Sequence, residues 1–272
     1  MLSHDHRHQR LGHAVKAAAF YDLDGTLMGL NLIHGTIFAF SYIGAWSGRV
    51  TSVLGLATRL PMLFLAERHD RHLLNLVLFE MFKGIPRARL MTLGEEYCDR
   101  VLIANMYPSA IEMIATNRDA GLEPVLVTGS PDFIVEPLAR RLGIETFVAN
   151  RLAFNDGFAT GRLCEPVIVG DAKAAWCTQF AKANRISLID SWGYADSHYD
   201  LPFLAALGHP VAVNPNRRLL AVARQLRWPI VRFDKTAEFH RPLGIGPDAP
   251  DARHPIDERP QPKDHGTAQR RA

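Results

Sequence analysis

The sequence predicts an α/β fold, a doubly wound (Rossmann-like) parallel sheet with an α-helical cap inserted after the first strand. Three observations lead to this prediction. Short apolar runs that stop at Gly, Asp or Asn alternate with helical stretches over much of the chain. One long segment interrupts the alternation with helical runs alone, and acidic or hydroxyl residues follow the apolar runs. Alternation of this kind is typical of a parallel sheet covered by helices.

The elements follow in order along the chain. The predicted strands are KAAAFYD (16–22), EPVLVTG (123–129) and HPVAVN (209–214). The predicted helices are PSAIEMIATNRDAG (108–121), PDFIVEPLARRLG (131–143), DAKAAWCTQFAKAN (171–184) and NRRLLAVARQLR (216–227). Between them, NRLAFNDGFATGRL (150–163) has two strand-like runs around Asn-Asp-Gly, which predicts a β-hairpin.

The helical insert is expected at residues 30–106, and the core domain at residues 16–29 and 107–233. The insert contains no convincing strand, and its position predicts a cap over the carboxyl edge of the sheet. Its longest apolar candidate, residues 51–66, carries Arg59 and Pro61 and is shorter than the ~20 apolar residues of a membrane span. We therefore expect no transmembrane helix, and leave peripheral contact with lipid open.

Both ends of the chain are polar and lack apolar periodicity, so we expect disorder at residues 1–15 and 234–272. The net charge of +3 gives no reason to expect nucleic-acid binding. The three cysteines share no metal-like spacing, and no secretory signal opens the chain, which indicates a cytoplasmic protein. The sequence leaves the oligomeric state open.

A pair of acids closes the first predicted strand. Asp22 and Asp24 lie two positions apart, directly before Gly25. One Asp at a strand end can simply cap a helix. Two of them, separated by a glycine-assisted turn, allow one carboxylate to attack while the other transfers protons, provided that a cation offsets their charge.

Further polar residues lie at the ends of neighbouring elements. Thr128, Gly129 and Ser130 end the second strand and offer hydroxyl and amide donors for phosphate oxygens. Lys173, near the start of a helix, supplies a fixed positive charge, and Asp196 and Asp200 occupy an acidic loop between a strand and a helix. Each of these residues alone can be explained as a helix cap or a surface charge. Capping and surface charge do not explain why all of them converge at one edge of a sheet.

Together, D-x-D-G-T, the strand-end Thr, the Lys and D-x-x-x-D resemble the four motifs of the haloacid dehalogenase superfamily of hydrolases, in order and spacing. The helical insert, the hairpin and GHPVAVNPNRRLLAVARQLRWPI (208–230) are similar to its subfamily IB, the phosphoserine-phosphatase-like branch. The resemblance implies a phosphomonoester hydrolase. Asp22 would attack phosphorus to form an aspartyl-phosphate, and Asp24 would protonate the leaving alkoxide and then activate water.

The resemblance also implies roles for the other motif residues. Thr128, with Gly129 and Ser130, would hold the phosphoryl group, and Lys173 would balance its charge. Mg²⁺ would bind to the Asp22 and Asp196 side chains and to the main-chain carbonyl of Asp24. Asp200 would orient a metal-bound water or Lys173.

Two other functional interpretations start from the same residues. A receiver-type signalling module also gathers acids, a Thr and a Lys around Mg²⁺, and a haloalkanoate dehalogenase shares the nucleophile without the metal. Neither has a use for an acid at Asp24. For a phosphatase, the candidate substrates are phosphoserine, histidinol phosphate and a lipid head-group phosphate such as phosphatidylglycerophosphate. Phosphoserine phosphatases tend to carry a Glu nine residues after the nucleophile, where this chain has the neutral Asn31.

Overall fold

The computed structural model describes residues 16–30 and 71–233 of the 272-residue chain. All of them belong to one compact unit. The predicted terminal segments and residues 31–70 of the predicted insert lie outside the described residues, as does Asn31.

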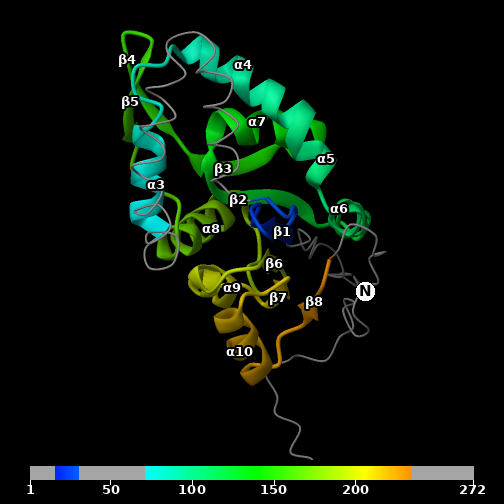
Figure 1. The fold of residues 1–272 in the computed structure, drawn as a ribbon. Helices are drawn as coiled ribbons and strands as arrows, with labels where there is room; N and C mark the ends of the chain where they lie inside the picture. The colour runs from blue at the N-terminus through cyan, green and yellow to red at the C-terminus, as the bar shows by residue number, and fades with distance from the viewer. Residues whose placement is uncertain (1–15, 31–70, 234–272) are drawn as a thin grey trace, which may run out of the picture. The chain divides into compact units, whose positions relative to one another are not determined.

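In the described part of the chain, six parallel strands form one sheet in the order β3-β2-β1-β6-β7-β8 (Figure 1). The strands are β1 (Ala18–Tyr21), β2 (Glu123–Pro131), β3 (Thr146–Asn150), β6 (Trp192–Ala195), β7 (His209–Val213) and β8 (Ile230–Val231). β1 lies in the middle, and all four of its residues are buried, as expected for a strand covered on both faces. The predicted α/β fold class is confirmed. β1 and β7 fall within two of the predicted strands, and β2 extends two residues beyond the third, which was predicted at 123–129.

Helices cover the sheet on both faces. They are α6 (Pro108–Asp119), α7 (Asp132–Arg141), α8 (Asp171–Asn184), the 3₁₀ turn η2 (His198–Asp200), α9 (Leu201–Ala205) and α10 (Arg217–Gln225). Side chains alternate along β1, so Phe20 joins a core cluster with residues of α8, α9 and α10, whereas the Tyr21 hydroxyl accepts a 2.8 Å bond from Asn117 of α6. The predicted helices at 108–121, 131–143, 171–184 and 216–227 are thus present.

The hairpin is also present. Strands β4 (Leu152–Asn155) and β5 (Phe158–Leu163) pair antiparallel, and the intervening Asp156 and Gly157 have φ of 48° and 81°. Two consecutive left-handed residues match the twist of a tight hairpin, which explains the Asp-Gly sequence.

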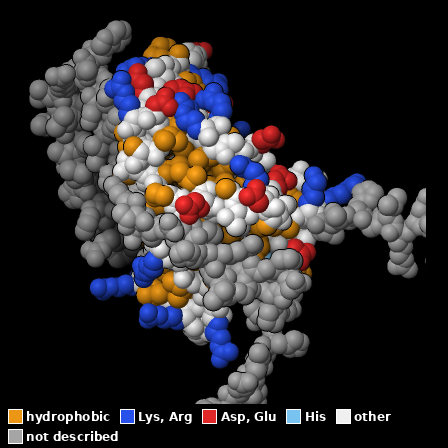
Figure 2. Space-filling model, turned by 90° about the vertical axis from the view of Figure 1, so that its right-hand side faces the viewer, with side chains coloured by type: hydrophobic (Ala, Val, Ile, Leu, Met, Phe, Trp, Pro, Cys, Tyr) orange, Lys and Arg blue, Asp and Glu red, His pale blue; other side chains and the backbone are white. Residues whose placement is uncertain are grey.

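The described part of the insert is helical. It contains α3 (Arg71–Glu80), α4 (Arg87–Tyr97), a π-helical turn η1 (Cys98–Leu102) and α5 (Ile103–Asn105). The extent of a cap domain over residues 30–106 stays a prediction. None of the described helices has both the length and the apolar character of a membrane span. Figure 2 shows acidic and basic side chains intermixed over the upper part of one face, around a central group of apolar side chains.

Candidate active site

The predicted site residues lie at the carboxyl edge of the sheet, around the end of β1. From β1 the chain first continues to β2 and β3 on one side, and later returns to β6 on the other side. Ligands of open α/β sheets bind where the strand order reverses in this way. The backbone N–H of Asp22 donates a 2.9 Å hydrogen bond to the Tyr194 carbonyl of β6, which holds the two strand ends together.

Asp22 is held at both carboxylate oxygens. Its Oδ1 accepts a 2.6 Å bond from Lys173 Nζ, and its Oδ2 accepts a 3.1 Å bond from Thr26 Oγ1. The residue is only 5% exposed, and Thr26 is fully buried. Thr26 is the threonine of the D-x-D-G-T motif, so the turn after β1 fixes the orientation of its own first acid.

Lys173 joins two carboxylates. It belongs to the buried face of α8, which repeats at Lys173, Cys177 and Ala181, and its ammonium group reaches Asp22 at 2.6 Å and Asp200 at 2.7 Å. Burial alone would lower the pKa of Lys173, but the Asp200 and Asp22 carboxylates raise that pKa above its usual value. Lys173 is therefore protonated at neutral pH and supplies the predicted fixed charge.

Asp200 occupies the N-cap position of α9, but its side chain makes no capping hydrogen bond there. Instead the carboxylate accepts from Lys173. The interpretation of Asp200 as a plain helix cap is therefore wrong.

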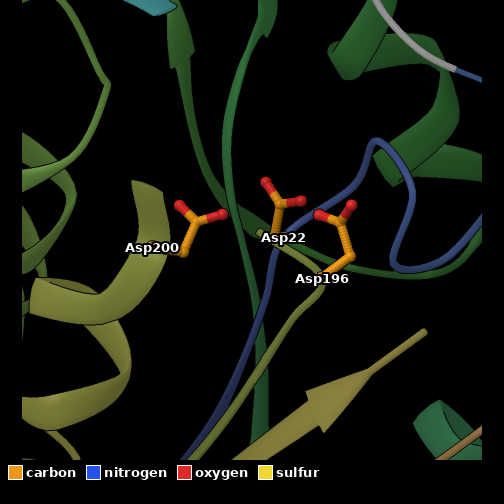
Figure 3. Close-up of side chains that lie close together, drawn as sticks. All are labelled: Asp22, Asp196 and Asp200. Carbon is orange, nitrogen blue, oxygen red and sulfur yellow. The ribbon is translucent and has the colours of Figure 1, made fainter. Parts of the chain in front are cut away.

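Three carboxylates converge beside this ammonium group. One oxygen each from Asp22, Asp196 and Asp200 lies within 4.8 Å of the others, and Figure 3 shows Asp22 between the other two. Three ionised carboxylates and one ammonium leave two negative charges in a largely buried space, which a divalent cation would neutralise. Closely spaced carboxylate oxygens suit Mg²⁺, so the residues fit the expected ion.

Gly25 makes room for this cluster. A Cβ on Gly25 would lie 2.4 Å from Asp196 Oδ2, and the glycine has a φ of +82°. Both the close approach and the left-handed conformation require glycine at this position. The turn after β1 can therefore accommodate the Asp196 carboxylate.

Asp24 is directed elsewhere. Its Oδ2 accepts a 2.5 Å hydrogen bond from Ser130 Oγ, and its side chain is not a member of the three-carboxylate group. Ser130 also donates its backbone N–H to Thr128 Oγ1 at 3.1 Å. Of the predicted phosphate-binding residues, only Gly129 and Lys173 line the cavity, while the Thr128 and Ser130 hydroxyls are buried beside it.

The cavity opens to solvent. It is lined by Asp22, Asp24, Asn75, Gly129, Ile168, Val169, Lys173, Asp196, Ser197, Tyr199 and Asp200. The sequence did not single out five of these, Asn75, Ile168, Val169, Ser197 and Tyr199. The last two lie at variable positions of the D-x-x-x-D motif.

Asn150 is a further residue that the sequence did not single out. It is fully buried, its Nδ2 donates to the Gly129 carbonyl at 2.8 Å, and its Oδ1 accepts from the Ile168 backbone at 2.7 Å. The amide thus joins the end of β2 to the loop before α8, and positions two walls of the cavity.

The family model of the haloacid dehalogenase-like hydrolases matches residues 19–205, and the chain belongs to this family. As the resemblance implied, it is an enzyme of the HAD phosphatase type.

The chain is 30% identical over 219 residues to phosphoserine phosphatase SerB1 of Mycobacterium tuberculosis, which covers 80% of this chain and 71% of the relative. A solved structure of a protein of unknown function from Bordetella pertussis matches with a TM-score of 0.69 and 23% identity, over 80% of this chain and 98% of that one. The phospho-aspartyl intermediate analogue of phosphoserine phosphatase matches with a TM-score of 0.61 and 18% identity, over 82% and 95%. These two structures support the fold.

Proposed function

We propose that this protein is a Mg²⁺-dependent phosphomonoester hydrolase that transfers the phosphoryl group of its substrate to Asp22. One observation carries the proposal. Asp22 is fixed between Lys173 and Thr26 at the centre of a carboxylate cluster, while Asp24 is directed away from that cluster. The two acids thereby have separate environments, which a nucleophile and an acid–base group require.

In the first step, a carboxylate oxygen of Asp22 forms a bond to phosphorus as the bond from phosphorus to the alcohol oxygen breaks. The carboxyl group of Asp24 donates its proton to the departing oxygen. In the second step, the Asp24 carboxylate takes a proton from water as the water oxygen attacks phosphorus. The phosphorus–Asp22 bond then breaks, which releases inorganic phosphate and restores both acids.

Charge is the main obstacle to this reaction, because an anionic nucleophile must approach a phosphate dianion. Lys173 offsets part of the repulsion from its fixed position against Asp22. The side chains of Asp22 and Asp196 and the main-chain carbonyl of Asp24 would hold Mg²⁺, with Asp200 acting through Lys173. When bound, the ion neutralises charge on the nucleophile and on the phosphoryl oxygens.

The substrate we propose is a small-molecule phosphate monoester. The relative named phosphoserine phosphatase supports this class, whereas the neutral Asn31 argues against a substrate ammonium group at that position. A lipid head-group phosphate is the second candidate substrate, because the insert is rich in apolar residues.

The test is hydrolysis of p-nitrophenyl phosphate, followed by a panel of phosphoserine, histidinol phosphate and lipid phosphates. We expect turnover with Mg²⁺ at neutral pH, its loss in excess EDTA, and its abolition by Asp22→Asn. Full activity in EDTA would contradict the metal dependence, and an active Asp22→Asn variant would contradict the nucleophile.

A further inference from the structure

Asn75 is a buried amide on α3, outside the sheet, and it lines the cavity. The side chain is 4% exposed. No described residue forms a hydrogen bond with the Asn75 side chain, so its amide is available to a ligand in the cavity.

The position of Asn75 suggests which part of a ligand it meets. Its Nδ2 lies 3.5 Å from the point that a Cβ on Gly129 would occupy. Asn150 Nδ2 approaches the same point at 3.7 Å, but both the nitrogen and the oxygen of that amide form hydrogen bonds with the protein backbone. Of these two amides, only Asn75 lines the cavity.

The expected phosphate donors at the end of β2 do not line the cavity. Ser130 Oγ donates to Asp24, and neither Ser130 nor Thr128 is among the lining residues. Lys173 already contacts two carboxylates. A phosphoryl group bound beside Gly129 would therefore need another donor, and a neutral amide supplies one without adding charge.

We propose that Asn75 Nδ2 donates a hydrogen bond to a non-bridging oxygen of the phosphoryl group, so that α3 contributes a substrate-binding residue to the site. The inference rests on the proposed phosphatase function and deepens it. Since the non-bridging oxygens are common to every phosphate monoester, Asn75 acts on all substrates alike, and also on inorganic phosphate.

The test compares Asn75→Leu with Asn150→Leu. Asn75→Leu removes the donor at similar volume, so we expect an unchanged or higher Tm together with a fall in kcat/KM of about 10²–10³-fold. The fall should be equal for p-nitrophenyl phosphate, phenyl phosphate and phosphoserine. Asn150→Leu should instead lower Tm, because its two backbone bonds are lost. Asn75→Asp should reduce kcat/KM further, since its carboxylate would repel the phosphoryl group.

Calorimetric titration with inorganic phosphate separates this inference from the proposed function, because it needs no turnover. Asn75→Leu should weaken phosphate binding at least about tenfold, as expected for one lost hydrogen bond to a charged group. Unchanged phosphate binding would overturn the inference even if the wild-type protein is an active phosphatase. So would a loss of kcat/KM that differs more than tenfold between leaving groups. Weaker binding in a protein that hydrolyses none of the esters would uphold the role of Asn75 and contradict the proposed function.

Discussion

Lys173→Met tests the electrostatics of the site. The substitution keeps the aliphatic volume but removes the ammonium group that contacts both Asp22 and Asp200. Breaking a buried ion pair from one side costs about 3–5 kcal/mol. For a domain of this size, that predicts a fall in Tm of roughly 6–20 °C. Lys182→Met, at an exposed position on the same helix, is the control and should change Tm little.

The contribution of Lys173 to stability should depend on pH in a defined direction. In the wild-type protein the folded-state pKa of Lys173 is raised, so its contribution to stability is fully present below its usual pKa of about 10.4. That contribution is lost only as pH rises through the higher folded-state value, and is therefore constant between pH 5 and 8.

The assay is thermal unfolding in EDTA, followed by circular dichroism from pH 8 to pH 5. We expect Lys173→Met to have the lower Tm throughout this range, by a similar amount at each pH, because the contribution of Lys173 is constant there. Equal Tm values throughout this range would refute the charge compensation that we assign to Lys173.

Three further substitutions test other parts of the site. Gly25→Ala should abolish activity and weaken Mg²⁺ binding, because its Cβ would lie 2.4 Å from Asp196 Oδ2. The control is Gly84→Ala, which has a similar φ of +80° and nothing within 4 Å, so it should introduce only backbone strain. Equal effects of the two substitutions on Mg²⁺ binding would contradict the role that we assign to the close approach of Gly25 and Asp196. Asn150→Asp keeps the acceptor but places a carboxylate against the Gly129 carbonyl, so kcat/KM should fall and partly recover toward acidic pH. If the ratio of the variant's kcat/KM to that of the wild type did not change with pH, the role of Asn150 in positioning Gly129 would be contradicted. Asp24→Asn should slow turnover by about 10²–10⁴-fold while the first step still proceeds with a good leaving group, and normal turnover would show that Asp24 is not the acid–base group.

Much of the fold could be predicted from the sequence because its central strands are continuous apolar runs. β1 and β2 are deeply buried, and their ends coincide with polar motifs. β3 was not identified, since it lies at the end of the sheet order with three of its five residues only half buried. β8 has two residues, which is too short for any periodicity.

The acids and the lysine could be predicted because they form a recognisable pattern in the sequence. This pattern is the spacing of Asp22 and Asp24 and the position of Lys173 and Asp196 at the ends of predicted elements. The amides carry none. Asn75 is a single polar residue in an otherwise apolar helical run, and only the packing of α3 near Gly129 shows what it faces. The hydroxyls of Thr128 and Ser130 were expected to contact the phosphate, but in this structure they form hydrogen bonds within the protein, beside the cavity. The spacing of residues in the sequence does not contain this information.

The most direct test of the account is chemical trapping of the phosphorylated enzyme. Borohydride reduces an aspartyl-phosphate to homoserine, so Asp24→Asn would be mixed with p-nitrophenyl phosphate and Mg²⁺, reduced, and analysed by peptide mass spectrometry. The account predicts homoserine at position 22 when substrate is present, and none when Asp22 is also changed to Asn. Substrate turnover with an unmodified Asp22, or trapping at another residue, would contradict it.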